Sequence, residues 1–155
     1  GWTVGITDIS DAALENAKKE IEAVGAKCFT YKFDVSDKAA YKTAFDDFVS
    51  KNGGLDFIIN NAGVGDGGLF GEYELDKWDW ITGINQMAVV YGSHYAAQVM
   101  KKQRSGHILT ISSIAGVASM TNMSMYNVTK AAVLALGESI YAELKPFGIH
   151  TSVAL

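Results

Sequence analysis

Short apolar segments alternate with longer amphipathic segments along the whole sequence, and this alternation constrains the fold more than any other feature. Five apolar runs read as strands, at residues 2–7, 28–33, 55–59, 107–112 and 149–153. The segments between them carry apolar residues at helical spacing, at about 10–24, 36–49, 76–102 and 126–145. Strands that alternate with helices favour a parallel sheet covered on both faces. We therefore expect an α/β fold with a doubly wound parallel sheet in three α/β/α layers.

Polar side chains follow four of the predicted strands at or just beyond their carboxyl ends. They are Asp8, Asp34, Asn61 and Ser113. Because ligands of such sheets bind beyond the carboxyl ends of the strands, we expect these four residues on one functional rim.

Tyr126 is followed four residues later by Lys130, which places the ammonium beside the phenol if both lie on one helix. A positive charge held close to a phenol favours the phenolate, so the pair can exchange a proton with a substrate oxygen. The same spacing occurs at Tyr73/Lys77, which reads as a solvated helix start, and at Tyr141/Lys145, at the end of a helix. Only Tyr126 has a serine thirteen residues upstream, Ser113, where an apolar run ends.

Composition excludes several classes of function. The chain has 155 residues, 48% of them hydrophobic, which suits a single globular domain over 1–155. A net charge of -4 with scattered basic residues argues against nucleic acid or an anionic membrane as partner. The single cysteine, Cys28, excludes an internal disulfide and fits the cytoplasm, and the three histidines show no metal-ligand spacing. No segment is apolar over the ~20 residues that a membrane span needs.

Taken in order, the polar positions resemble the classical type of the short-chain dehydrogenase/reductase family over essentially the whole chain. The residues that carry the resemblance are Asp8, Asp34-Val35, Asn60-Asn61-Ala62-Gly63, Asn85, Ser113, Tyr126 and Lys130. The resemblance implies a Rossmann-type fold and hydride transfer between a nicotinamide cofactor and an alcohol or carbonyl substrate.

The resemblance also implies a role for each of these residues. Tyr126 would be the general acid/base, Ser113 would position the substrate oxygen, and Asn85 would hold a water in a proton relay. Lys130 would favour the ionised form of Tyr126 and bind the nicotinamide ribose, and Tyr126 would also contact the cofactor. Asp34 and Val35 would bracket the adenine, and the cofactor cleft would be lined by Asn61, Ala62 and Gly63.

Asp8 predicts NAD in preference to NADP. An acidic side chain at this position of such folds accepts hydrogen bonds from the adenosine ribose hydroxyls and repels a 2′-phosphate. Along the chain, no lysine or arginine follows until Lys18.

Two features of the family pattern are absent from the sequence. The glycine-rich phosphate turn with its strand should precede Gly1, and a Pro-Gly pair should follow the last strand. We therefore expect a partial domain, incomplete at both ends, whose sheet divides between the strands at 2–7 and 55–59. A 155-residue chain alone is expected to be inactive and prone to aggregation.

Other interpretations remain open at this point. Asp8 can simply cap a helix, Ser113 can form a turn, Asn85 can be an ordinary helix-interior residue, and the methionines near 120–125 can line a substrate pocket or only pack the loop. The whole chain can also be a dinucleotide-binding scaffold or sensor without turnover.

The helices at 76–102 and 126–145 carry small and apolar residues over much of their circumference. The resemblance implies association through these two helices, so we expect a homodimer or homotetramer.

Overall fold

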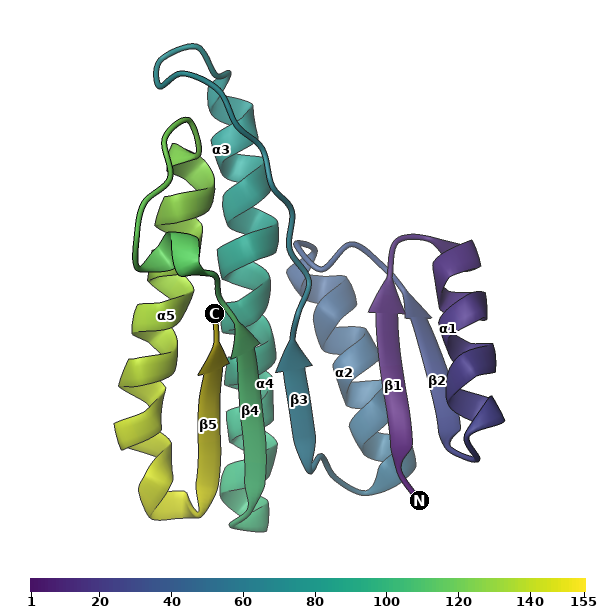
Figure 1. Cartoon of the computed structure of the whole chain (residues 1–155). Helices are drawn as coiled ribbons and strands as arrows, with labels where there is room; N and C mark the ends of the chain where they lie inside the picture. The colour runs from purple at the N-terminus through teal and green to yellow at the C-terminus, as the bar shows by residue number, and fades with distance from the viewer. The chain divides into compact units, whose positions relative to one another are not determined.

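The structure is a computed structural model that describes all residues 1–155, and it consists of two compact units, Gly1–Gly53 and Gly54–Leu155 (Figure 1). Every strand pair is parallel, which confirms the predicted α/β class. The strands form two separate sheets, β1-β2 in the first unit and β3-β4-β5 in the second, and this division falls between the strands where the sequence predicts it. No helix combines the length and the apolar character needed to cross a membrane.

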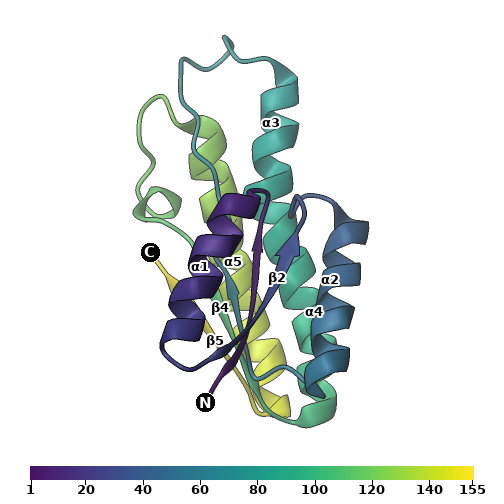
Figure 2. The same cartoon turned by 90° about the vertical axis from the view of Figure 1, so that its right-hand side faces the viewer.

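In the first unit, two helices lie on opposite sides of a two-stranded sheet (Figure 2). The strands are β1 (Thr3–Asp8) and β2 (Lys27–Lys32), and the helices are α1 (Asp11–Ala23) and α2 (Lys38–Asn52). Each helix begins at a side-chain cap: the Ser10 hydroxyl accepts the N–H of Ala13, and the Asp37 carboxylate accepts the N–H groups of Ala39 and Ala40. Gly53 ends α2 in the left-handed conformation, at φ 74°.

In the second unit, three parallel strands carry the segments that hold most of the predicted site. The strands are β3 (Phe57–Asn60), β4 (Gly106–Ile111) and β5 (Ile149–Ala154); the helices are α3 (Leu75–Thr82), α4 (Ala88–Gln103) and α5 (Ser124–Leu144). Ile108 and Thr110 of β4 are buried, with 0% and 2% of their surface exposed. Val133 of α5 and Met100 of α4 are also fully buried, so the core of this unit lies between the sheet and these two helices.

The predicted single helix over 76–102 is wrong in one respect, because it is interrupted by a π-helical turn. α3 ends at Thr82, Gly83–Met87 form the π turn, and α4 begins at Ala88. The Ala88 N–H donates to the Gly83 carbonyl, five residues earlier instead of four. Apolar spacing reveals that a segment is helical, but it does not resolve one extra residue in a turn. Asn85 lies in the middle of this turn.

The fit between α5 and β5 depends on a glycine. A Cβ at Gly137 would lie 2.2 Å from Cγ2 of Val153, a stiff β-branched side chain. Alanine is favoured over glycine by up to about 1 kcal/mol inside a helix. Overpacking costs about 1–3 kcal/mol, so the clash outweighs the gain in helix propensity.

We therefore expect Gly137→Ala to destabilise the protein by ~1 kcal/mol, measured as the midpoint of denaturant unfolding. In a Val153→Ala background, the methyl group that causes the clash is gone, and Gly137→Ala should become neutral or stabilising. Equal destabilisation by Gly137→Ala in both backgrounds would contradict this account of the helix–sheet contact.

Candidate functional site

Tyr126 and Lys130 lie one turn apart in the first part of α5, which begins at Ser124, two residues before the predicted start. The Lys130 Nζ atom is 5.7 Å from the centroid of the Tyr126 ring. Tyr126 is partly exposed, whereas Lys130 has only 4% of its surface exposed. The helix thus brings a cation and a phenol to the same face, as the i, i+4 spacing predicts.

The buried Lys130 is held by the end of the neighbouring strand β4. Its Nζ donates to the Ile111 carbonyl at 2.9 Å, and the Ser112 hydroxyl donates to the Lys130 carbonyl at 2.8 Å. Burial lowers the pKa of the Lys130 ammonium, because desolvation disfavours its charged form. One of its three N–H bonds goes to Ile111, which leaves donors for a ligand or for the tyrosine oxygen.

Ser113 begins a single 3₁₀ turn, Ile114–Gly116, that packs against the backbone of α5. A Cβ at Gly116 would lie 2.8 Å from the Lys130 carbonyl oxygen, so this close approach requires glycine. The Ser113 Oγ accepts the Ala115 N–H at 3.2 Å. That bond uses a lone pair and leaves the hydroxyl hydrogen of Ser113 free to donate.

Asn85 is completely buried, and its side-chain amide joins three segments of the second unit. Its Oδ1 accepts the Val64 N–H at 2.8 Å and its Nδ2 donates to the Val64 carbonyl at 2.8 Å. The same Nδ2 donates to Thr129 Oγ1 at 3.2 Å. Both amide hydrogens are therefore used within the protein, and a water on this side chain would have to donate to Oδ1.

Thr129 is a component of the site that the sequence analysis missed. It is fully buried, and its hydroxyl accepts from Asn85 and donates to the Tyr126 carbonyl at 2.9 Å. Its place three residues after Tyr126, at the start of the same helix, was a signal available in the sequence. Nothing in the sequence indicated the contact of Thr129 with Asn85, which is 44 residues away along the chain.

The segment after β3 lies against the same groups. Asn61, Ala62 and Gly63 are exposed, and a Cβ at Gly63 would lie 3.5 Å from both Lys130 Nζ and Asn85 Oδ1. The preceding Asn60 is buried instead, and its Nδ2 donates to the Ser93 hydroxyl of α4 at 3.0 Å. Gly63, Asn85, Tyr126 and Lys130 are thus brought together, while Asn60 serves the packing of strand and helix.

In the first unit, Asp8 is the last residue of β1 and Asp34 follows β2, and both stabilise turns of their own chain. Asp8 Oδ1 accepts the Ser10 N–H at 2.8 Å. Asp34 Oδ1 accepts the Ser36 N–H at 2.9 Å and the Ser36 hydroxyl at 2.7 Å, and the neighbouring Val35 is half-buried. Each carboxylate keeps further acceptor capacity for a ligand.

A basic residue lies closer to Asp8 than sequence distance suggests. Lys32 is the partner of Asp8 in the parallel ladder of β1 and β2. Its ammonium is ion-paired with the Asp11 carboxylate at the start of α1. Lys32 is the basic side chain that would favour a 2′-phosphate beside Asp8, but its positive charge is already compensated by the Asp11 carboxylate.

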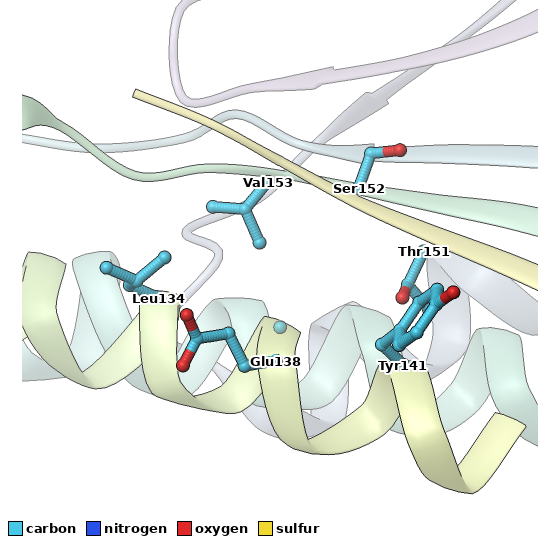
Figure 3. A pocket seen from close by; sticks show the side chains of 7 residues that line it. Leu134, Glu138, Tyr141, Thr151, Ser152 and Val153 are labelled. Atoms are coloured by element: carbon cyan, nitrogen blue, oxygen red, sulfur yellow. The ribbon is translucent and has the colours of Figure 1, made fainter.

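A shallow groove of about 340 Å³ lies elsewhere in the second unit, between α5 and β5 (Figure 3). Leu134 and Glu138 of α5 face Thr151 and Val153 of β5 across it, and Ser152 points to the other side of the strand. The groove begins a full turn beyond Lys130 along α5, and none of the predicted site residues lines it.

Known proteins resemble this chain along most of its length. The profile of the family described as short chain dehydrogenase matches residues 1–155. The probable oxidoreductase EphD of Mycobacterium tuberculosis is 30% identical over 150 residues, which are 96% of this chain and 25% of EphD. The curated relatives compared are covered over 25% to 61% of their own length.

Solved structures share the fold. A short-chain dehydrogenase/reductase of Burkholderia phymatum in complex with NAD superposes with a TM-score of 0.93 at 32% identity, over 99% of this chain and 56% of that one. A metagenomic short-chain oxidoreductase in complex with NADP has a TM-score of 0.94 at 27% identity, over 99% and 70%. With a family match along its entire length, this chain belongs to the short-chain dehydrogenase family.

Proposed function

We propose that the protein is an oxidoreductase that transfers a hydride between NAD(H) and an alcohol or carbonyl substrate, with Tyr126 as general acid/base. The observation that carries this proposal is the Tyr126–Lys130 pair beside Gly63 and Asn85, in a member of the short-chain dehydrogenase family. The relatives that bind NAD or NADP support a nicotinamide cofactor. The family match is continuous from 1 to 155, which supports a single, dinucleotide-binding domain.

The residues around Lys130 fit the ribose of such a cofactor. The buried Nζ keeps donors beyond its bond to Ile111, and Gly63 leaves open a space that a Cβ would fill at 3.5 Å from Nζ. When bound there, the nicotinamide supplies or accepts the hydride. We assign the adenosine end to Asp8, Asp34 and Val35, and the lining of the cleft to Asn61, Ala62 and Gly63.

Proton transfer is the task of the chain's own side chains. In reduction, the Tyr126 hydroxyl donates its proton to the substrate oxygen as the carbonyl becomes an alcohol; in oxidation, the phenolate removes that proton. The Lys130 ammonium favours the phenolate through its charge. The free hydroxyl hydrogen of Ser113 orients the substrate oxygen, and Asn85 keeps the segment at Val64 in place.

The substrate is proposed to be a small alcohol or ketone. The homodimer or homotetramer and the cytoplasmic location expected from the sequence stay predictions.

Replacing Tyr126 by Phe removes one oxygen atom and tests the assignment of the acid/base. We expect kcat in the full-length protein to fall by about 10²–10⁴-fold, because general acid/base catalysis contributes that much. The Kd for the cofactor, measured by fluorescence or calorimetry, should stay within about twofold, since other groups bind it.

Tyr141→Phe is the matched control, because Tyr141 has a lysine at the same spacing and is 51% exposed. Its turnover should equal that of the wild type. If Tyr126→Phe keeps full turnover, the catalytic role is wrong; if the wild type binds the cofactor without turnover on any alcohol or ketone, the scaffold or sensor alternative is favoured.

The Asp8 carboxylate is expected to select NAD, and Asp8→Asn should weaken that selection. The amide oxygen of Asn can still accept the Ser10 N–H, so the turn before α1 is retained while the negative charge is lost. We expect kcat/KM with NADP to rise about tenfold relative to that with NAD.

Asp46→Asn on α2 provides the control, because it also removes one carboxylate of the first unit, from an exposed ion pair with Lys42. It should leave the cofactor ratio unchanged. A wild-type protein that turns over NADP as well as NAD would overturn the assignment of Asp8.

A further inference from the structure

The second Tyr-x-x-x-Lys pair, Tyr73/Lys77, has a defined structural task. The sequence suggests only a solvated helix start here, and Tyr73 lies just before α3. In the structure both side chains bind the glycine-rich loop 64–72 that follows β3. The Tyr73 hydroxyl contacts the carbonyl of Gly68, and Lys77 Nζ lies 2.6 Å from the Asp66 carboxylate. The Lys77 ammonium and the Gly67 N–H lower the pKa of Asp66, which keeps this ion pair charged.

The same tyrosine joins loop 64–72 to loop 117–123, which follows β4. Its hydroxyl lies 3.2 Å from the Asn122 carbonyl, and the Gly68 N–H donates to that carbonyl at 2.8 Å. The approach is close: a Cβ at Gly67 would lie 2.9 Å from the Asn122 oxygen. Asn122 itself adopts the left-handed conformation, at φ 61°. The single hydroxyl of Tyr73 therefore lies within hydrogen-bond distance of a backbone carbonyl of each loop.

Both loops are fastened to the candidate site at their other ends. Loop 64–72 starts at Val64, which is held by the Asn85 amide. Loop 117–123 connects Ser113 to α5 and is held by Asn127, whose side chain makes two hydrogen bonds with the Met120 backbone, at 2.8 and 3.2 Å. Tyr126 follows Asn122 by four residues. The two loops extend beyond the carboxyl ends of β3 and β4, where a substrate that reaches Tyr126 would bind (Figure 1).

Few apolar contacts help to order loop 64–72. Leu69 is 57% exposed and Phe70 is 77% exposed, although the Phe70 ring makes an edge contact with Trp78 at 6.4 Å between centroids. A loop without buried side chains depends on its hydrogen bonds for a single conformation. The hydroxyl of Tyr73 and the ammonium of Lys77 supply such bonds from the adjoining helix start.

We propose that Tyr73 and Lys77 are positioning residues: Tyr73 joins loops 64–72 and 117–123 into one wall of the substrate site, and Lys77 fixes Asp66 in the first of these loops. This inference rests on the proposed function for the identity of the site. The pair takes no part in proton transfer. It holds the wall that the substrate contacts, so its loss weakens substrate binding and leaves the chemical step at Tyr126 intact.

The test compares Tyr73→Phe with Tyr141→Phe in the full-length protein. Tyr73→Phe should raise KM for the alcohol or ketone about tenfold, with kcat and the cofactor Kd within about twofold. Hydrogen exchange at residues 64–72 should become faster, and exchange in β3 and β4 should not change. Tyr141→Phe should leave KM and exchange at wild-type values.

Gly67→Ala is an independent variant, because it pushes the two loops apart without touching Tyr73. It should reproduce the rise in KM and the faster exchange. Unchanged KM, or wild-type exchange in loop 64–72 of Tyr73→Phe, would overturn the inference. Failure of the proposed function would be seen in a different experiment. Full turnover by Tyr126→Phe would refute the acid/base role of Tyr126, and the hydrogen-exchange rates of the two loops do not affect that conclusion.

Discussion

The arrangement of the candidate site depends on one buried amide, the side chain of Asn85. Three hydrogen bonds of this group connect the segment after β3 to the first turns of α5, through Val64 and Thr129. Each bond contributes about 0.5–1.5 kcal/mol net, but a buried N–H or C=O left without a partner costs about 1–3 kcal/mol. Removal of Asn85 would take away the side-chain partner of both backbone groups of Val64 and of the buried Thr129 hydroxyl, so a loss of structure would accompany any effect on proton transfer.

The site is held together largely by hydrogen bonds between side chains and backbone groups. A few such bonds fix the position of α5 relative to the end of β4. Lys130 binds the Ile111 carbonyl, Ser112 binds the Lys130 carbonyl, and Thr129 binds the Tyr126 carbonyl. These bonds link the end of β4 to the helix that carries the phenol. Tyr126 is partly exposed, whereas Asn85, Thr129 and Lys130 are buried.

Sequence periodicity predicts the elements of this chain well and their mutual contacts poorly. Capping by Ser10 and Asp37, the parallel strands and the shared face of Tyr126 and Lys130 follow from local chemistry, and all appear in the structure. The bonds of Thr129 with Asn85 and of Tyr73 with Asn122 join residues more than 40 positions apart, and nothing local encodes them. Lys32 illustrates the same limit, because ladder register, not sequence distance, brings it beside Asp8.

The three Tyr-x-x-x-Lys pairs show how context decides the use of one spacing. On α5, a buried lysine and a partly exposed tyrosine form the proposed acid/base. Tyr73 and Lys77, at the start of α3, bind a backbone carbonyl and a carboxylate of the neighbouring loop. At the end of α5, the Lys145 ammonium lies 5.5 Å from the centre of the exposed Tyr141 ring. Burial of the lysine, with its desolvated ammonium, distinguishes the first pair from the others.

The π turn at Gly83–Met87 has a consequence for the evolution of this chain. It adds one residue to a continuous helical path, and the widened turn absorbs that residue without rotating α3 relative to α4. Deletion of a single residue there would restore ideal helical winding and remove the widened turn. Asn85 lies in this turn, and its side chain would lose the backbone geometry on which its bonds to Val64 depend. Single-residue deletions should therefore be rare in this turn, even where substitutions are accepted.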